Sequence, residues 1–198
     1  MPDTAVARPL LTHPVRVTLR DGTPVWIRPV RTDDYAAIHT FLAGLSQDSL
    51  YYRGCGYPNI DFLTGWSLDI DFHDRYGVLV ADGLWGPVLG HAAYVRETGS
   101  RVEAAFEVAD SLQGLGMGTL LLAHLAAVAA YNGFQQLEAA VMPANHLMLE
   151  TLRDSGFEIT ADRNDGLRYV VLSTELTDTV RAAFAARGQA QALALLTG

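Results

Sequence analysis

Three glycines alternate with larger residues in segment 113–119, whose sequence is QGLGMGT. The segment follows a strand-like run that ends at Val108, and it opens an apolar run that predicts a long helix. The first backbone N–H groups of a helix have no partner within it, and the helix dipole attracts anions to that end. Glycines also remove the Cβ atoms that would hold a phosphate away from the backbone. The segment therefore predicts a site for a phosphate-bearing ligand.

Two other interpretations of the glycine segment stay open at this point. A dinucleotide site of the G-x-G-x-x-G type needs a glycine where Thr119 stands, although Glu138 does lie at about the right distance for its acidic residue. The strand before the segment carries Glu103 and Glu107, which a strand buried on both faces tolerates poorly. A turn without a ligand would lose backbone entropy at three glycines with no evident gain in packing.

Gln113, Gly116 and Gly118 match the pattern Q/R-x-x-G-x-G/A, and here the chain resembles the GNAT family of N-acetyltransferases. In that family the loop holds the pyrophosphate of acetyl-CoA. The resemblance thus implies acetyl-CoA as acyl donor. It also implies a set of cofactor-binding residues in the loop, namely Gln113, Gly114, Leu115, Gly116, Met117, Gly118 and Thr119.

Asn145, followed at plus eleven and plus twelve by Gly156 and Phe157, is similar to a second family motif. The resemblance implies that Asn145 contacts the pantetheine arm of the cofactor, and a role as helix N-cap is compatible with that contact. The motif often has a tyrosine that protonates the departing thiolate, and Leu152 stands at its position. No tyrosine acid is therefore carried over to this chain.

Acetyl transfer to an amine needs a base, because an ammonium ion has no lone pair with which to attack the thioester. Glu103 lies ten residues before Gln113 and resembles the catalytic glutamate of the protein-lysine branch of the family. Glu107 shares its strand face and is the second candidate, and a solvent-facing role for both is the alternative. The family polarises the thioester carbonyl with a backbone N–H that maps near Val108.

Segments 20–31 and 45–53 look like the acetyltransferase domain of bacterial Pat-type protein lysine acetyltransferases. This resemblance implies a protein lysine as acceptor. Family patterns often continue Arg-Phe where this chain has Arg53 followed by Gly54, which is a departure on the acceptor side. Two alternatives are kept: acetylation of a small amine metabolite, and a non-catalytic regulator that binds CoA on the same fold.

The composition excludes several other classes of function. The formal charge of −8 repels nucleic acid, so nucleic acid is not an expected partner. All 14 basic residues are arginine, which excludes a Schiff-base lysine and a phosphate-loop lysine. Cys55 is the only cysteine and predicts an incidental thiol, with no internal disulfide.

Neither a membrane span nor a metal site is expected. The longest apolar run, 120–131, is too short to cross a bilayer, and the N-terminus lacks the pattern of a secretory signal, so we expect a cytoplasmic protein. The acidic stretch 69–74 contains a single histidine, and this composition favours a solvated loop over a metal centre.

The order of elements predicts an α/β (α+β) GNAT fold with a central mixed, mostly antiparallel sheet flanked by helices. Residues 1–14 are expected to form a flexible leader, 15–175 the acetyltransferase domain, and 176–198 a helical extension that could serve a homo-oligomer. The predicted strands are 15–19, 25–27, 76–81, 88–95, 102–108, 137–141, 157–160 and 167–172. The predicted helices are 35–45, a short one from about 46, one within 54–74, 116–132, 145–156 and 177–196.

Overall fold

The computed structural model of the chain describes residues 13–99, 101–164 and 166–197. The leader expected over 1–14 lies outside the described residues except for its last two. Within the described part, eight strands form one sheet in the order β1-β2-β3-β4-β5-β6-β8-β7. Every neighbouring pair is antiparallel except β5 and β6, which run parallel. The strands are β1 (Val15–Thr18), β2 (Pro24–Pro29), β3 (Arg75–Ala81), β4 (Val88–Thr98), β5 (Arg101–Val108), β6 (Gln136–Val141), β7 (Ile159–Asn164) and β8 (Leu167–Ser173).

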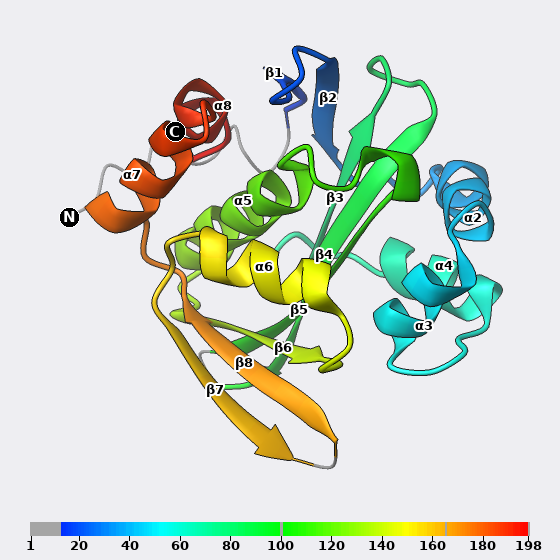
Figure 1. Cartoon of the computed structure of the whole chain (residues 1–198). Helices are drawn as coiled ribbons and strands as arrows, with labels where there is room; N and C mark the ends of the chain where they lie inside the picture. Colours follow the sequence, from blue (N-terminus) through cyan, green and yellow to red (C-terminus); the bar gives the residue numbers. More distant parts are fainter. Residues whose placement is uncertain (1–12, 100, 165, 198) are drawn as a thin grey trace.

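Helices lie on both sides of this sheet (Figure 1). Several begin at a residue whose side-chain oxygen accepts a backbone N–H three residues later, as Ser46, Asn59, Asn145 and Thr177 do. The helices are α2 (Tyr35–Ala43), α3 (Gln47–Gly54), α4 (Ile60–Leu68), α5 (Met117–Tyr131), α6 (His146–Asp154), α7 (Asp178–Ala186) and α8 (Ala190–Thr197), with a 3-10 turn, η1 (Asp110–Leu112).

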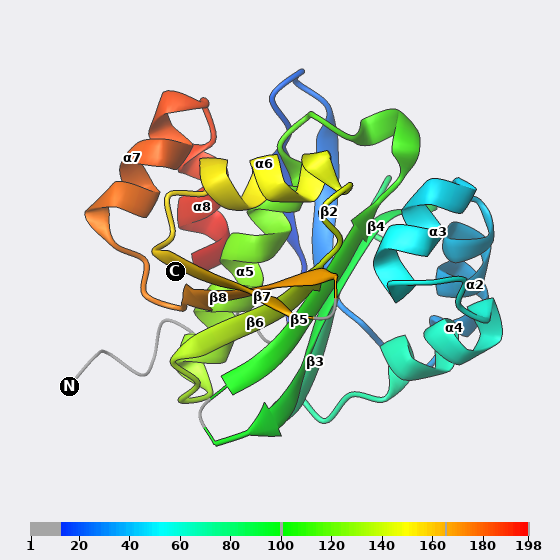
Figure 2. The ribbon, with the colours of Figure 1, turned by 60° about the horizontal axis from the view of Figure 1, so that its bottom comes forward.

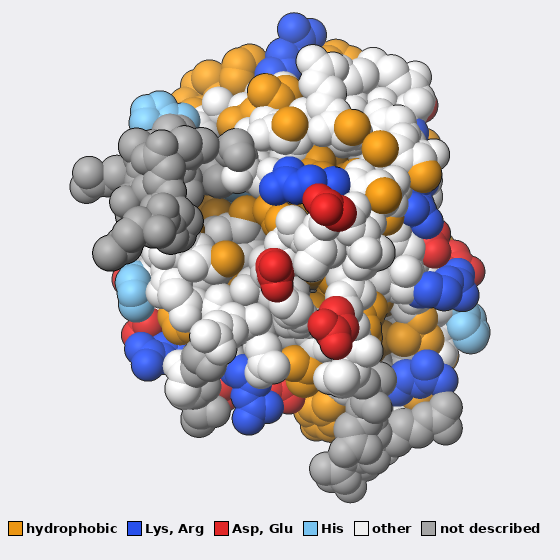
Figure 3. All heavy atoms as spheres, turned by 90° about the vertical axis from the view of Figure 1, so that its left-hand side faces the viewer, with side chains coloured by type: hydrophobic (Ala, Val, Ile, Leu, Met, Phe, Trp, Pro, Cys, Tyr) orange, Lys and Arg blue, Asp and Glu red, His pale blue; other side chains and the backbone are white. Residues whose placement is uncertain are grey.

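The helices form two groups on opposite faces of the sheet. Helices α2, α3 and α4 lie together on one face, and α5, α6, α7 and α8 lie on the other (Figures 1 and 2). The larger hydrophobic core lies between the sheet and α5, and the smaller one between the sheet and α2 with α4. On the side formed by α7 and α8, acidic and basic side chains are interspersed (Figure 3).

Helix α5 is the central element of the larger core, because almost every residue from Met117 to Ala129 is buried. That burial explains why the helix is apolar on all sides although it crosses no bilayer. No helix in the described part of the chain is long and apolar enough to span a membrane.

The parallel strands β5 and β6 pair only over their first three residues. Their register ends at Glu103 opposite Glu138, while β4 stays paired with β5 as far as Val108. Beyond Glu103 the two strands therefore part, and the fold opens a space between them at the end where the glycine segment begins.

The predicted fold class is confirmed, and each predicted helix and strand has a counterpart within a few residues. The C-terminal extension differs in detail, since it forms two helices with a turn at Gly188, whose φ is +71°. A left-handed backbone at this glycine reverses the chain direction and returns α8 to α5 and β1.

Candidate active site

One cavity of about 1020 Å³ occupies the space between the parted strands. This is near the upper end of the range for small-molecule pockets, about 300–1,000 Å³. Its walls are 103–108 of β5, 139–141 of β6, residues 113, 114 and 116–119 before and in α5, and α6 with the residues just before it. A fifth wall comes from α3 and α4. The cavity thus joins the glycine segment to Glu103.

The glycine segment has the backbone conformation that only glycine adopts easily. Gly114 and Gly116 have φ values of +80° and +85°, and Gly116 is the N-cap of α5. Gly118 lies in the first turn, where an added Cβ would make ordinary contacts at 3.5 Å with Phe106 and Thr151. The turn therefore presents backbone, not side chain, at the start of a 15-residue helix.

Polar contacts tie the approach to this turn to helix α3. Asp110 accepts hydrogen bonds from the Ser46 backbone N–H, the Ser46 hydroxyl and the Ser49 hydroxyl at 2.6–2.9 Å. The Gln113 amide donates to the Ser49 Oγ at 3.3 Å and to the Val108 carbonyl at 3.2 Å. The glycine turn is thereby fixed relative to both β5 and the opposite wall of the cavity.

Glu103 lines the cavity at the point where β5 and β6 part, with its side chain open to solvent. Partial desolvation by the cavity wall raises the pKa of Glu103. The neighbouring Glu97 and Glu138 raise that pKa further, and Arg53 opposes them. A carboxylate with a raised pKa that is accessible from a cavity is suited to accept a proton.

Glu107 lies on the same wall but in a different environment. Its carboxylate accepts hydrogen bonds from Arg53 Nε at 2.7 Å and from the His91 ring at 2.8 Å. Burial favours the neutral form of Glu107, but the charge of Arg53 and these bonds outweigh it and lower the pKa. Glu107 is thus engaged as an anion by two partners, whereas Glu103 makes no such pair among the described residues.

The wall from α3 and α4 contributes aromatic side chains and the single thiol. Tyr52, Phe62 and Trp66 line the cavity there, and Phe62 is exposed. Cys55 also lines it, in a left-handed conformation at the end of α3. Burial and the nearby Glu103 raise the pKa of the Cys55 thiol, which makes it a poor nucleophile.

The start of α6 closes the cavity on the side of β6. Asn145 lines the cavity, and its Oδ1 caps the helix by accepting the Met148 N–H at 3.1 Å. Leu152, at the position of the family tyrosine, is buried in the large core and is not part of the cavity wall. The side chain at position 152 therefore packs in the hydrophobic core and does not face the cavity.

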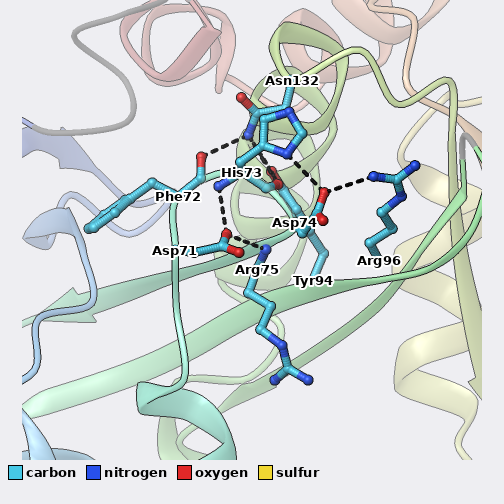
Figure 4. Close-up of polar contacts among 8 residues, drawn as sticks. All are labelled: Asp71, Phe72, His73, Asp74, Arg75, Tyr94, Arg96 and Asn132. Carbon is cyan, nitrogen blue, oxygen red and sulfur yellow. Dashed lines mark hydrogen bonds and ion pairs between the residues drawn. The ribbon is translucent and has the colours of Figure 1, made fainter.

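The acidic stretch 69–74 does not line the cavity, and hydrogen bonds connect 71–75 with one another and with neighbouring segments (Figure 4). Asp71 accepts the backbone N–H groups of His73 and Arg75, both at 2.8 Å. Asp74 pairs with the His73 ring at 2.8 Å and with Arg96 at 3.2 Å. In the described residues no three His, Cys, Asp or Glu side chains are grouped so as to hold a metal ion.

Of the residues predicted to bind cofactor, all but one lie in the wall of this single cavity. The exception is Leu115, whose side chain packs against the large core, so a contact through that side chain is not supported. Sequence reasoning missed Arg20, which lines the cavity from the turn between β1 and β2. It also missed the pairing of Arg53 with Glu107, 54 positions apart. No local pattern signals either, because both arise from the tertiary fold.

Comparison with known proteins agrees with this geometry. Residues 33–157 match the model of the acetyltransferase (GNAT) family. The chain belongs to that family. It is 30% identical over 139 residues to the acetyltransferase Pat of Mycolicibacterium smegmatis, covering 68% of this chain and 41% of Pat. It is 30% identical over 159 residues to an acetyltransferase of Pseudomonas aeruginosa, covering 77% of this chain and 85% of the relative.

The GNAT domain of PAT from S. lividans has the same fold. The two structures superpose with a TM-score of 0.74 at 30% identity, over 81% of this chain and 96% of that domain. The chain spans only about two fifths of the length of the mycobacterial Pat. The resemblance to the GNAT family, and within it to Pat, is thus confirmed.

Proposed function

We propose that this GNAT chain transfers an acetyl group from acetyl-CoA to an amine, with a protein lysine as acceptor and Glu103 as general base. The observation that carries the proposal is the cavity itself. It has a glycine-lined helix start on one wall and a carboxylate of raised pKa on another, at the point where β5 and β6 separate.

The residues present fit the donor. The turn at Gly114 and Gly116 leaves backbone N–H groups without Cβ atoms beside them, which suits a diphosphate. Asn145 and residues 103–108 of β5 line the cavity beyond that turn, and this stretch of wall suits an extended pantetheine arm. Bound acetyl-CoA would supply the thioester carbonyl carbon that the amine attacks.

Glu103 would hold the proton that the amine must lose. A lysine ammonium is charged at neutral pH, and it becomes nucleophilic only when a base takes one proton. The C–N bond then forms as the C–S bond breaks, and a backbone N–H near Val108 would stabilise the negative charge on the carbonyl oxygen. After the attack the nitrogen loses its second proton to solvent, and the leaving thiolate takes a proton from solvent, because Leu152 supplies none.

The acceptor side of the cavity suits a side chain that projects from a protein. Tyr52 and Trp66 provide apolar walls, and the exposed aromatics Tyr57 and Phe62 lie on helix α4 or close to it. Exposed aromatic side chains at a cavity are typical of surfaces that bind a partner. Together with the likeness to Pat, this favours a protein lysine over a small amine.

Ligand-dependent melting tests the donor. At about 100 times its dissociation constant a ligand adds about 2.7 kcal/mol, a shift of roughly 5–10 °C for a chain of this size. We expect that shift with acetyl-CoA and with CoA, and none with NAD. A shift with NAD alone would favour the dinucleotide site, and no shift with any ligand would favour a ligand-free turn.

The absence of lysine simplifies the test of the acceptor. Any acetyl-lysine formed in a mixture of this chain, acetyl-CoA and a candidate protein must lie on the candidate, because the chain itself contains no lysine. Mass spectrometry of a lysine peptide and of its arginine counterpart gives the matched comparison. Acetylation of small amines but of no lysine peptide would select the metabolite alternative, and CoA binding without any transfer would select the regulator.

A further inference from the structure

The side chain of Gln189, in the C-terminal part of the chain, contacts two residues that line the donor end of the cavity, Arg20 and Gly116. Gln189 lies in the turn between α7 and α8 and is 1% exposed. Its backbone N–H donates to Phe184 O and its carbonyl accepts from Leu193 N, both at 2.9 Å. The turn is therefore held from both helices, and its side chain is fixed in position.

This side chain joins the glycine turn to the turn between β1 and β2. Gln189 Nε2 donates to the Gly116 carbonyl at 3.2 Å, and Gln189 Oε1 accepts from Arg20 Nη2 at 3.4 Å. A Cβ at Gly116 would come within 2.4 Å of Gln189 Nε2 and 2.8 Å of Arg20 Nε. The Arg20 guanidinium thus lies directly beside the N-cap of α5.

The Arg20 guanidinium carries a positive charge and has no anionic partner beside the glycine turn among the described residues. It forms no ion pair with any other described residue, although it lines the cavity. Asp154, the acid whose charge acts on Arg20, already pairs with Arg153 at 3.4 Å and Arg187 at 3.2 Å. Partial burial and the charge of Arg187 lower the pKa of Arg20, and Asp154 raises it, but an arginine stays charged at neutral pH.

We propose that Arg20 binds a phosphate group of acyl-CoA at the glycine turn, and that Gln189 positions its guanidinium for this contact. The inference rests on the proposed function, because it assumes that the cavity takes acyl-CoA. An unpaired guanidinium beside a helix N-terminus forms charge-assisted hydrogen bonds with phosphate oxygens. The two C-terminal helices, which follow the part matched by the family model, thereby become part of the donor site.

Titration calorimetry with CoA tests the role of Arg20. We expect Arg20→Ala to raise the Kd for CoA about tenfold and to flatten its dependence on salt, since one ionic contact is lost. Arg20→Lys should recover most of the affinity. The matched control is Arg16→Ala, which removes the same charge from an exposed position on β1 outside the cavity wall and should leave the Kd unchanged.

Dephospho-CoA, which lacks the 3′-phosphate, distinguishes the two phosphate sources. If Arg20 binds the diphosphate, Arg20→Ala weakens both ligands equally. If it binds the 3′-phosphate, the substitution weakens CoA and leaves dephospho-CoA unaffected. Equal Kd values for wild type, Arg20→Ala and Arg16→Ala with both ligands would overturn the inference while leaving the proposed function intact. Absence of CoA binding by the wild type would overturn both.

Gln189→Ala separates a positioning role from a purely structural one. If Gln189 positions Arg20, Gln189→Ala should raise the Kd for CoA about threefold and flatten its salt dependence. In a protein that already carries Arg20→Ala, the same substitution should not raise the Kd further. A structural role lowers the melting temperature of both backgrounds equally and leaves the Kd of the folded protein unchanged. That second result would overturn the assignment of Gln189.

Discussion

Arg53 and Glu107 form a buried ion pair, with Arg53 Nε 2.7 Å from Glu107 Oε2 and their side chains 10% and 4% exposed. The guanidinium also stacks over the Trp66 ring, 4.8 Å from its centroid. On the other side of the carboxylate the His91 ring, fully buried, lies 2.8 Å from Glu107 Oε1. The pair therefore attaches α3 and α4 to β5, and the wall that faces Glu103 depends on it.

Glu107→Gln is expected to destabilise the protein by about 3–5 kcal/mol, because it leaves the charge of Arg53 buried without a partner. Urea unfolding at pH 7 measures the loss. The matched control is Glu138→Gln, which breaks the 3.3 Å pair with Arg101 at a more exposed position and should cost no more than about 1 kcal/mol. Equal, small losses for both substitutions would show that the buried pair is dispensable.

Glu103→Gln is expected to lower kcat by about 10²–10⁴-fold with little change in the KM for acetyl-CoA, because general base catalysis contributes about that factor. The raised pKa of Glu103 also predicts a rate that rises with pH through that pKa as the carboxylate becomes free to accept a proton. A pH profile of kcat/KM measures both effects. The rise should be absent in Glu103→Gln.

Glu97→Gln provides a sharper control for the base. Glu97 contributes to raising the pKa of Glu103, so neutralising it should move the pH profile to lower pH and leave the plateau rate unchanged. A wild-type rate in Glu103→Gln, or a profile that Glu97→Gln does not move, would remove Glu103 from the role of base.

Gly116→Ala is expected to impair both folding stability and CoA binding. Its φ of +85° costs an alanine about 1–2 kcal/mol, and the new Cβ would lie 2.4 Å from Gln189 Nε2. Gly133 has the same φ of +85° at the other end of α5 with open space around it, so Gly133→Ala reproduces the strain alone. Calorimetry should give a Kd for CoA raised at least tenfold in Gly116→Ala and unchanged in Gly133→Ala. Equal Kd values for the two variants would show that Gly116 is needed for the backbone conformation of the turn and not for CoA binding.

The local part of this site could be predicted from the sequence. Alternation of side chains along 102–108 places Glu103 and Glu107 on one face, in agreement with the unbroken pairing of 102–108 with β4, and the glycine-rich segment does form a turn at the start of the predicted helix. These features depend on backbone geometry over a few residues, which residue type strongly determines.

Contacts between distant segments could not be predicted in this way. The bond from Arg20 to Gln189 joins positions 169 apart, and that from Arg53 to Glu107 joins positions 54 apart. The first depends on how the β1–β2 turn meets the α7–α8 turn, and the second on how α3 packs against β5. Alternation alone therefore leaves Glu103 and Glu107 equivalent. The family resemblance ranks Glu103 first, and the different partners of the two carboxylates in the fold give a physical reason for that order.

A buried histidine connects the C-terminal helix to the core and sets the last prediction. His124 of α5 lies between the Leu196 carbonyl, 3.2 Å from Nδ1, and the Tyr76 hydroxyl, 2.8 Å from Nε2. A carbonyl only accepts hydrogen bonds, so Nδ1 carries a proton, and in the neutral ring Nε2 then accepts from the Tyr76 hydroxyl. This tautomer is the neutral imidazole, and burial lowers the pKa of His124 to about 4.

The protein is therefore expected to lose stability between about pH 6.5 and pH 4. In that window the unfolded chain binds a proton at residue 124 that the folded chain does not. The free energy of unfolding therefore decreases as the pH is lowered, by at most about 3 kcal/mol. Urea unfolding at pH 7, 6, 5 and 4.5 measures this slope, and His124→Gln, which keeps a polar side chain, should flatten it. The exposed His39 gives the control, since His39→Gln should leave the slope as in the wild type. A slope that survives in His124→Gln would assign the acid sensitivity to carboxylates instead, which lose their ion pairs mainly below about pH 4.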